Sequence, residues 1–486
     1  MRERGGFEGR WQWASGDSRW RRAQSFRRQQ LTSRGRATLA LLSGLAAALA
    51  IIAGLGGVGV APPDAEPLPA VFTAVPRVRP APPPPPEVLE RLPAGRRALD
   101  LPSAAPPGFD SSPSPDTPEG GRLYEWVSVS QRDARVIGPL RIEYTLDADL
   151  TRIVFRILKR ARVEFGHVIL LDPTTGRVLT YVSTDVVRFS GTEAYPAASL
   201  VKIITAAAAL GSDPALARLP CRYRGSPYRL TRSRIDPPRT GKIASLRQAL
   251  ATSNNQCFAQ LAVHAVGEAP LREAIASFGW LSSPAPAHAA GTIEMGEDRY
   301  DLARVGCGLA GCRITPLHAA QLAATLARGE LISPRWIERI FDAGGRELPL
   351  PALRAPRRVL TPEIASDLRM MLVETTRRGT ARGAFHRADG RPLLGSVQVA
   401  GKTGSLSGSQ PAGRYEWFIG VAPADEPRIA VAVLLLQGHL WWRNAAQIAA
   451  EVLRVVFCPA GACKAESVER WTHPRVELPT ETGAAG

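Results

Sequence analysis

One uncharged stretch of 24 residues near the N-terminus constrains this chain most. Residues 37–60 contain no Asp, Glu, Lys, Arg or His and consist mainly of Ala, Leu, Ile, Gly and Val. At about 1.5 Å per residue, a helix of this length crosses the ~30 Å hydrocarbon core of a bilayer. We therefore predict one N-terminal transmembrane helix that stays attached as an anchor. A cleaved signal peptide is the alternative, although a 36-residue leader and so long an apolar stretch both exceed what such peptides use.

The flanks of this stretch predict its orientation. Residues 1–36 carry ten Arg and three acidic residues, so they form an Arg-rich tail that the positive-inside bias places in the cytoplasm. Everything after residue 61 is then on the other side. We expect a single-pass protein of the cytoplasmic (inner) membrane whose main domain is periplasmic or, more generally, extracytoplasmic.

The net charge of +17 at pH 7 invites comparison with nucleic-acid-binding proteins. Residues 121–486 hold 46 basic and 33 acidic residues, but neither a Lys/Arg block nor a basic stripe interleaved with aromatic residues. We interpret this excess as a solvated, mildly basic surface, with an anionic partner in the cell envelope as the functional alternative. Nucleic acid is not an expected partner.

Composition then divides the rest of the chain. Residues 61–120 contain 18 of the 42 Pro and few large apolar residues, which predicts a semi-extended linker. Residues 121–464 are predicted to form one globular domain, and residues 465–486 a disordered C-terminal tail. An overall hydrophobic fraction of 45% is enough to fill a core.

The domain alternates between helical and strand patterns. Apolar spacing predicts helices at 147–163, 195–210, 246–266, 316–328, 361–376 and 444–457. Strands are predicted at 167–171 and 178–182 early in the domain, and at 397–402, 415–421 and 428–436 late in it. Two early and three late strands with helices between them indicate an α+β fold with one antiparallel sheet whose halves come from opposite ends of the domain.

Three short strings in the domain indicate chemistry. They are S-x-x-K at Ser199 and Lys202, S-x-N at Ser253 and Asn255, and K-T-G at Lys402, Thr403 and Gly404. By composition, all three occur together by chance in about one such chain in a thousand. Each string alone is weak evidence, because a serine at a helix start and a solvated lysine are common surface features.

The residue types in these strings suit an acyl transfer. Ser199 and Lys202 are three residues apart, so on a helix their side chains share one face. A hydroxyl needs a base to become nucleophilic, and the pKa of a lysine falls when the amine is buried or lies beside a second cation such as Lys402. The chain has 56 Arg but only five Lys, yet two of the five occur in these strings. Arginine could not give up a proton there.

From about residue 142 to 457 the chain resembles the penicillin-binding transpeptidase domain, most closely the monofunctional class B type. Besides the three strings, the stretches at 167–183, 313–326, 379–385 and 400–423 are similar to that family. The resemblance implies a serine β-lactamase/penicillin-binding transpeptidase-like α/β (α+β) fold, with a five-stranded antiparallel sheet flanked by helices.

The resemblance also implies a role for each site residue. Ser199 would be the nucleophile and Lys202 its base, and Ser253 would relay a proton to the leaving amine. Asn255 would hydrogen-bond the substrate peptide, while Lys402 and Thr403 would attract its carboxylate. Gly404 would let the substrate lie along the strand edge, and the backbone N–H groups of Ser199 and Ser405 would bind the oxyanion. No metal and no cofactor are expected.

The expected activity is D,D-transpeptidation of peptidoglycan stem peptides through a serine acyl-enzyme that β-lactams also form. A D,D-carboxypeptidase and a serine β-lactamase are alternatives, although no Glu occurs in the E-x-x-L-N context of class A β-lactamases. A membrane-anchored β-lactam sensor or scaffold is the non-enzymatic alternative. A Ser-His-Asp hydrolase is a poor competitor, since no G-x-S-x-G string is present and His167, His264 and His318 lie in apolar contexts.

Residues 61–141 are too short for a glycosyltransferase domain and for the large N-terminal pedestal domain usual in class B. We therefore expect a specialised or accessory role, with cell-wall synthesis machinery as the candidate partner. The six cysteines fit an oxidising compartment. We expect local disulfides between Cys307 and Cys312 and between Cys458 and Cys463, with Cys221 and Cys257 left as a third pair.

Overall fold

The computed structural model describes residues 122–130, 136–285, 288–341, 346–348, 354–438 and 442–472. The predicted anchor at 37–60 and linker at 61–120 lie outside the described residues. Within the described part of the chain, no helix has both the length and the apolar character needed to cross a bilayer.

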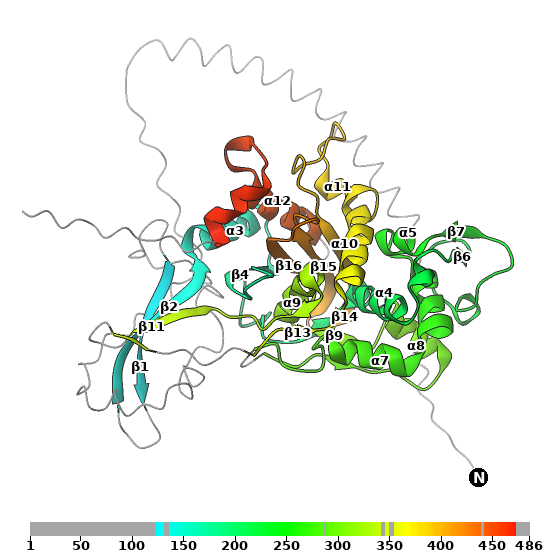
Figure 1. The fold of residues 1–486 in the computed structure, drawn as a ribbon, viewed down its shortest axis with the longest axis horizontal. Helices are drawn as coiled ribbons and strands as arrows, with labels where there is room; N and C mark the ends of the chain where they lie inside the picture. The colour runs from blue at the N-terminus through cyan, green and yellow to red at the C-terminus, as the bar shows by residue number, and fades with distance from the viewer. Residues whose placement is uncertain are drawn as a thin grey trace, which may run out of the picture. The chain divides into compact units, whose positions relative to one another are not determined.

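A five-stranded antiparallel sheet forms the centre of the domain (Figure 1). Its strands lie in the order β14 (Ala400–Ser409), β15 (Ala412–Ala422), β16 (Ile429–Gln437), β3 (Phe165–Leu171) and β4 (Val178–Ser183). Late strand β16 pairs directly with early strand β3, for example Ala432 with Ile169. The predicted sheet, with halves from opposite ends of the domain, is therefore confirmed.

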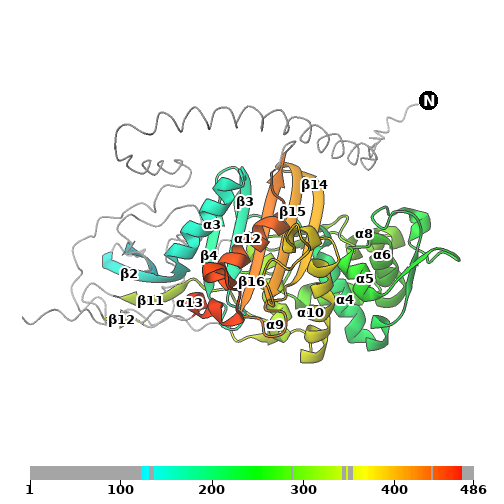
Figure 2. The same ribbon diagram turned by 90° about the horizontal axis from the view of Figure 1, so that it is seen from above.

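Both faces of the sheet are buried, because its central strands are apolar at nearly every position. In β16, all nine residues are buried. Val168 and Leu170 of β3 face one core with α3 (Ala148–Arg160) and α12 (Ala445–Phe457), whereas Ile169 and Leu171 face the other. This alternation follows from the two-residue period of a strand. Helices α9 (Pro316–Arg328) and α10 (Pro362–Arg377) cover the second face (Figure 2).

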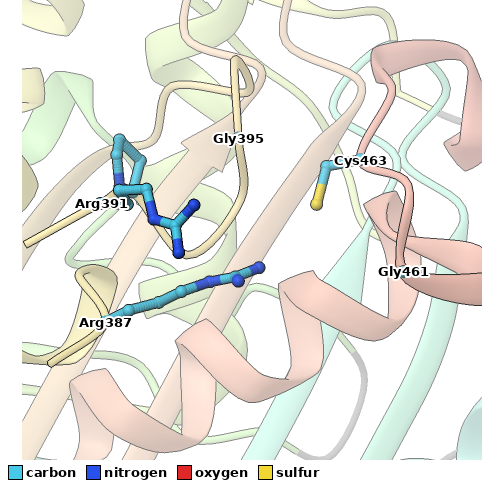
Figure 3. A pocket seen from close by; sticks show the side chains of 6 residues that line it. Arg387, Arg391, Gly395, Gly461 and Cys463 are labelled. Atoms are coloured by element: carbon cyan, nitrogen blue, oxygen red, sulfur yellow. The ribbon is translucent and has the colours of Figure 1, made fainter. Parts of the chain in front are cut away.

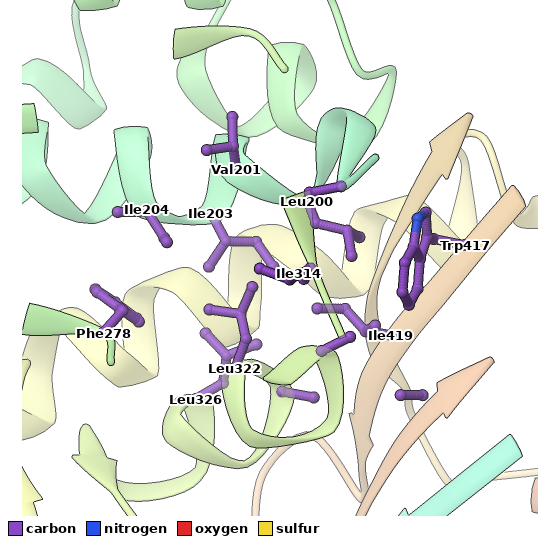
Figure 4. Packing of buried hydrophobic residues seen from close by; sticks show 14 of the residues in the cluster. Leu200, Val201, Ile203, Ile204, Phe278, Ile314, Leu322, Leu326, Trp417 and Ile419 are labelled. Atoms are coloured by element: carbon purple, nitrogen blue, oxygen red, sulfur yellow. The ribbon is translucent and has the colours of Figure 1, made fainter. Parts of the chain in front are cut away.

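A helical region continues from this second face. It contains α4 (Val201–Ser212), α5 (Leu246–Ala251), α6 (Asn255–Gln260), the π-helical turn η5 (Leu261–Val266), α7 (Glu268–Ser277) and α8 (Arg299–Gly306). Figure 4 shows Ile203 and Ile204 of α4 among Phe278, Leu322 and Leu326, with Leu200 beside Trp417 and Ile419 of β15. The turn before α4 is thus fixed by packing against the sheet.

Local signals explain where the main helices begin. Thr315 accepts a hydrogen bond from the backbone N–H of His318 in a capping box, Pro316 occupies the first turn, and Gly329 ends α9 in the left-handed conformation. Asn444 caps α12 in the same way with Gln447. These helices match the predicted ranges within one residue.

Smaller elements complete the fold. Strands β1 (Arg122–Ser130), β2 (Val136–Asp147), β11 (Ile337–Phe341) and β12 (Glu347–Leu348) form a four-stranded sheet in the order β1-β2-β11-β12, which was not predicted. The remaining short elements are β5 (Tyr195–Pro196), η2 (Ala198–Leu200), η3 (Pro214–Ala217), β6 (Cys221–Tyr223), η4 (Arg232–Arg234), β7 (Lys242–Ala244), β8 (Thr292–Ile293), β9 (Cys312–Ile314), β10 (Glu330–Leu331), β13 (Arg357–Arg358), α11 (Arg382–Phe385), η6 (Pro459–Gly461), η7 (Ala465–Val468) and α13 (Glu469–Thr472).

The helix predicted at 195–210 begins only at Val201, because Tyr195 and Pro196 pair with β9, and the strand predicted at 397–402 instead runs over Ala400–Ser409, paired with β15. Two further sequence predictions are wrong at the level of elements. The helix predicted at 246–266 is broken, because Ser253 adopts a φ of 55° between α5 and α6. The tail predicted to be disordered from residue 465 instead begins with η7 and α13. Val468 and Trp471 of these turns are buried against the core that contains α12, which explains their order.

The disulfide prediction is correct for two pairs and wrong for the third. Cys221–Cys257 and Cys458–Cys463 are bonded, whereas Cys307 and Cys312 are buried free thiols. Four residues separate these two cysteines, and each cysteine is held by its own element. The thiol of Cys307 at the end of α8 donates to the carbonyl of Arg304, and Cys312 opens β9 between β5 and β8.

Candidate active site

Ser199 lies in the tight turn η2, directly before α4. Ala198 takes a φ of 51°, and the following 3₁₀ turn leads into the helix at Val201. Ser199 of η2 and Lys202 of α4 are three residues apart, so their side chains lie on one face of the helical segment. The Nζ of Lys202 donates to the Oγ of Ser199 at 2.7 Å.

Lys202 is fully buried below this serine. Its Nζ also contacts Asn255 Oδ1 at 2.7 Å and Ser253 Oγ at 3.4 Å, and it lies 5.8 Å from the ring centroid of Phe258. No carboxylate is among these contacts. Burial therefore lowers the pKa of Lys202 to about 8. About one tenth of this amine is therefore neutral at pH 7.

Ser253 and Asn255 come from the break between α5 and α6. The side chain of Asn254 caps α6 by accepting from the N–H of Cys257, which leaves the residues on both sides of it facing Lys202. The Nδ2 of Asn255 donates to the carbonyl of Tyr228 at 2.8 Å, and this bond orients the amide oxygen toward the lysine.

Lys402 approaches from the opposite side, on the edge strand β14. Its Nζ donates to Ser253 Oγ at 2.9 Å and to the carbonyl of Thr403 at 2.7 Å. The side chain is fully buried, and burial together with the nearby charge of Lys202 holds its pKa well below the usual range of a lysine. Ser253 thus contacts two buried amines. Holding a full positive charge on both amines at once is energetically unfavourable, because they are close together and shielded from water.

The next three residues of β14 pass beside the serine turn. A Cβ added to Gly404 would lie 3.3 Å from the carbonyl oxygen of Ala197 and from the Cβ of Ala198, so a side chain here would crowd the turn. Ser405 follows immediately, exposed at the strand edge. Thr403 Oγ1 forms a 2.5 Å hydrogen bond with Thr380 Oγ1, in the connection between α10 and α11.

A charged group also reaches this edge. The Nε of Arg414, on the paired strand β15, donates to Ser405 Oγ at 2.7 Å and lies 3.3 Å from Glu416 Oε1. Glu416 is 9% exposed, and burial raises the pKa of its carboxyl. Since Arg414 occupies an acceptor position of Ser405, the hydroxyl proton of Ser405 remains available for a ligand.

The arrangement is competent for nucleophilic catalysis without a metal. A neutral Lys202 can accept the Ser199 proton, and Ser253 contacts both amines, so a proton can pass between them. Among the residues that the structure describes, no group of three His, Cys, Asp or Glu side chains could hold a metal ion. His167 is buried and stacks on Phe189, and its pKa is lowered by burial to about 3. His264 and His318 contact backbone carbonyls of Ile235 and Ser282 away from the site.

One described hollow lies apart from the Ser199 group. A space of about 370 Å³ is lined by Arg387, Arg391, Pro392, Gly395, Gly461 and Cys463 (Figure 3). None of these residues contacts the Ser199 group through a hydrogen bond.

The structure brings the eight predicted site residues to one place. Ser199, Lys202, Ser253, Asn255 and Lys402 share hydrogen bonds, and Thr403, Gly404 and Ser405 line the adjoining strand edge. Sequence reasoning missed Thr380, Arg414 and the carbonyl of Tyr228. Thr380 lies in the stretch at 379–385 that prompted the family resemblance, so the motif could have pointed to it. Arg414 and Tyr228 carry no such signal.

Comparison with protein families agrees with this geometry. The profile of the penicillin-binding protein transpeptidase domain matches residues 166–457. The chain is 27% identical over 314 residues to the peptidoglycan D,D-transpeptidase PbpA of Mycobacterium tuberculosis, covering 56% of this chain and 62% of that protein. It is 28% identical over 320 residues to PbpA of Mycolicibacterium smegmatis, with the same coverage. The chain thus spans about three-fifths of the length of these curated relatives.

Solved structures show the same fold. The imipenem acyl-enzyme complex of penicillin-binding protein A from M. tuberculosis aligns with a TM-score of 0.52 and 25% identity, over 64% of this chain and 79% of that one. A second structure of this M. tuberculosis protein aligns with a TM-score of 0.54 and 22% identity, over 69% and 96% of the two chains.

Proposed function

The chain belongs to the penicillin-binding protein transpeptidase family, and from this premise we propose that it is a serine D,D-transpeptidase that cross-links peptidoglycan stem peptides. The observation that carries the proposal is the hydrogen-bonded group of Ser199, Lys202, Ser253 and Lys402, with both amines buried. The relatives named as peptidoglycan D,D-transpeptidases, and the imipenem acyl-enzyme of a related protein, support this chemistry.

The donor is a stem peptide that ends in D-Ala–D-Ala. In the acylation step, Ser199 Oγ attacks the carbonyl carbon of its penultimate D-Ala. Its proton passes to neutral Lys202, and the oxyanion accepts hydrogen bonds from the backbone N–H groups of Ser199 and Ser405. The C–N bond then breaks. The leaving D-Ala amine takes a proton through Ser253, and an ester remains on Ser199.

In the second step, an amine on a neighbouring stem peptide attacks this ester. Lys202 and Ser253 take the proton from the attacking amine, the new amide is the cross-link, and Ser199 regains its proton. Asn255 binds the peptide backbone of the donor. Lys402, Thr403 and Ser405 attract its terminal carboxylate, while Gly404 keeps the strand edge open for the peptide.

The test is covalent labelling by a fluorescent penicillin. The full-length protein should be labelled at one site, with a mass increase equal to one penicillin on the peptide that contains Ser199. Ser199→Ala should abolish labelling, whereas Ser190→Ala, at a serine outside the site, should leave it unchanged. Labelling that survives Ser199→Ala would remove the assignment.

Product analysis distinguishes the related activities. A transpeptidase should join a pentapeptide donor to an amine acceptor, whereas a D,D-carboxypeptidase would release D-Ala with water as acceptor. Many turnovers of nitrocefin would identify a β-lactamase. An inert Ser199 with retained noncovalent binding of β-lactams would identify a sensor.

The proposed cellular setting rests on the sequence. Residues 37–60 would anchor the protein in the cytoplasmic membrane, with the catalytic domain outside the cytoplasm and the proline-rich segment 61–120 between them. A protease added to intact spheroplasts should then digest the catalytic domain but spare an epitope at residue 1. Protection of the catalytic domain would contradict this topology. Wall-synthesis machinery is the expected partner in this setting.

A further inference from the structure

Basic residues are concentrated in one part of the helical region, which we call the basic lobe (residues 218–247). It contains η4 and the β6–β7 hairpin, which lies beside α5 in Figure 1. The lobe has a single acidic residue, Asp236, against nine basic ones: Arg218, Arg222, Arg224, Arg229, Arg232, Arg234, Arg239, Lys242 and Arg247.

Acidic neighbours neutralise little of this charge. Among the described residues, Arg232 is the one base of the lobe that forms an ion pair, with Asp298 at 2.6 Å. Asp236 is itself bound by Arg299 and His264 from outside the lobe. Eight cations of the lobe therefore have no described carboxylate within ion-pairing distance.

Several of these cations are held in place by the backbone. Arg222 donates to the carbonyl of Arg239, and Arg224 to that of Thr240 at 3.0 Å. Arg234 donates to the carbonyl of Arg229 at 3.2 Å. Such bonds fix the side chains without cancelling their charge, so less conformational entropy is lost when an anion binds.

The lobe is connected directly to the proposed active site. The disulfide Cys221–Cys257 joins it to α6, and Gln256 Nε2 donates to the carbonyls of Arg224 and Ser226. The carbonyl of Tyr228 accepts from Asn255, whose Oδ1 contacts Lys202. Two hydrogen bonds therefore separate the backbone of the lobe from the amine that contacts Ser199.

We propose that the basic lobe binds a linear polyanion, a stretch of wall polymer that carries repeated phosphodiester or carboxylate groups and presents its peptide to Ser199. This inference rests on the proposed function and adds the charge of the substrate to it. The cations are spread over a hairpin and its loops instead of converging on one pocket, which suits a chain of charges better than a single small ion. Clustered charge of one sign also raises the local concentration of an oppositely charged ligand.

The test compares two double variants of the full-length protein in detergent. Arg239→Glu/Lys242→Glu removes four units of charge from the lobe. Arg156→Glu/Arg354→Glu makes the same change at exposed arginines of α3 and of the segment before β13. The probes are inorganic polyphosphate, poly-L-glutamate and phosphatidylglycerol vesicles, titrated at two salt concentrations.

We expect the unmodified protein to bind polyphosphate or poly-L-glutamate, and the lobe variant to bind it about tenfold more weakly. Added salt should weaken binding by the unmodified protein. The control variant should bind as the unmodified protein does, and both variants should react with fluorescent penicillin at the unmodified rate. The polymer that binds more tightly identifies the phosphate or the carboxylate source.

Equal affinity of the lobe variant and the unmodified protein for both polymers would overturn the inference, as would equal weakening in the two variants. Binding to vesicles alone would overturn it in favour of a membrane surface. Failure of the proposed function is distinct from these outcomes, because it appears as loss of penicillin labelling in the unmodified protein.

Discussion

Lys202 decides how the site responds to pH. Burial lowers its pKa to about 8, so below that pH the neutral amine becomes about tenfold scarcer with each unit of pH. If the neutral amine takes the proton of Ser199, the second-order rate constant for acylation by benzylpenicillin should rise about tenfold between about pH 6 and 7 and level off above about pH 9. Timed quenching followed by intact-mass measurement gives this constant. A flat profile across that range would exclude Lys202 as the base.

The same burial makes Lys202 a cost to stability. The folded-state pKa lies below the ordinary lysine value of 10.5, so between about pH 8 and 10.5 the unfolded chain binds more protons than the folded one. The resulting penalty is about 3 kcal/mol below pH 8, shrinks as pH rises from 8 toward 10.5, and vanishes above that.

Replacing this amine should therefore stabilise an inactive protein. Lys202→Met removes the penalty but leaves Asn255 Oδ1 without its donor, a loss of about 1 kcal/mol or slightly more. We expect a net gain of about 1–2 kcal/mol in the free energy of unfolding at pH 7, smaller at pH 10, with no penicillin labelling. Urea titrations at both pH values measure this. Lys464→Met, at an exposed lysine, should change stability little, and a destabilised Lys202→Met would contradict the argument.

At the scale of elements, the serine turn is held in place by the end of α8. Gly308, two residues after that helix, has a φ of +73°, and a Cβ built on it would lie 2.0 Å from the carbonyl oxygen of Ala198. No side chain fits between the two backbones. The position of Ser199 thus depends on a glycine more than one hundred residues away in sequence.

Gly308→Ala should displace the turn that carries Ser199. We expect acylation by penicillin to slow more than about tenfold and the free energy of unfolding to fall by about 2 kcal/mol or more. Gly390→Ala is the matched control, because its φ is +83° but nothing lies within 4 Å of the added Cβ. Gly390→Ala should lower the free energy of unfolding through backbone strain but leave the rate of acylation by penicillin unchanged. Equal acylation rates in the two variants would mean that Gly308 does not position the turn.

Some helices and strands could be predicted from the sequence and others could not, and the difference has physical causes. Strands β3, β4, β15 and β16 have strong apolar patterns, and α9 has clear caps, so local information was sufficient for them. Strand β14 extends to Ser409 through Gly and Ser residues that carry no strand pattern, and its pairing with β15 defines it. The break at Ser253 was missed because it lies within an apolar pattern that continues on both sides, and it is stabilised by Asn254 and by contacts with Lys202 and Lys402. The S-x-N string predicted that Ser253 and Asn255 act together. The left-handed backbone conformation of Ser253 depends on tertiary contacts, which the string does not reveal.

Sequence spacing was also a poor guide to cysteine pairing and charge. The spacing of Cys307 and Cys312 equals that of the bonded pair Cys458–Cys463, yet α8 and β9 hold the first two as separate thiols. The basic lobe contains no Lys/Arg block, because its nine cations are spread over thirty residues. Pairing of β6 with β7 brings the two ends of this segment together, and the disulfide Cys221–Cys257 ties the segment to α6.

At the scale of the whole molecule, the sheet joins strands from both ends of the domain. Strand β3 pairs on one side with β4, its neighbour in sequence, and on the other with β16, more than 250 residues away. Until β16 is in place, the apolar strand β3 has an open edge. The serine turn packs on β15 through Leu200 and Trp417, so the site also depends on this late pairing. Helix α12 then covers the face that β3 and β16 share.

Removing α12 should therefore abolish the fold and, with it, the site. A chain that ends at residue 441 loses the buried side chains of Ile448, Val452, Leu453, Val456 and Phe457. At about 1.5–3 kcal/mol each, this loss is comparable to the entire stability of a typical domain. We expect no penicillin labelling and rapid proteolysis. A chain that ends at Thr472 keeps α12 and the hydrogen bond from Arg177 Nη1 to the Thr472 carbonyl, so it should be labelled normally. Labelling of the shorter chain would show that the sheet and the Ser199 site form without their C-terminal cover.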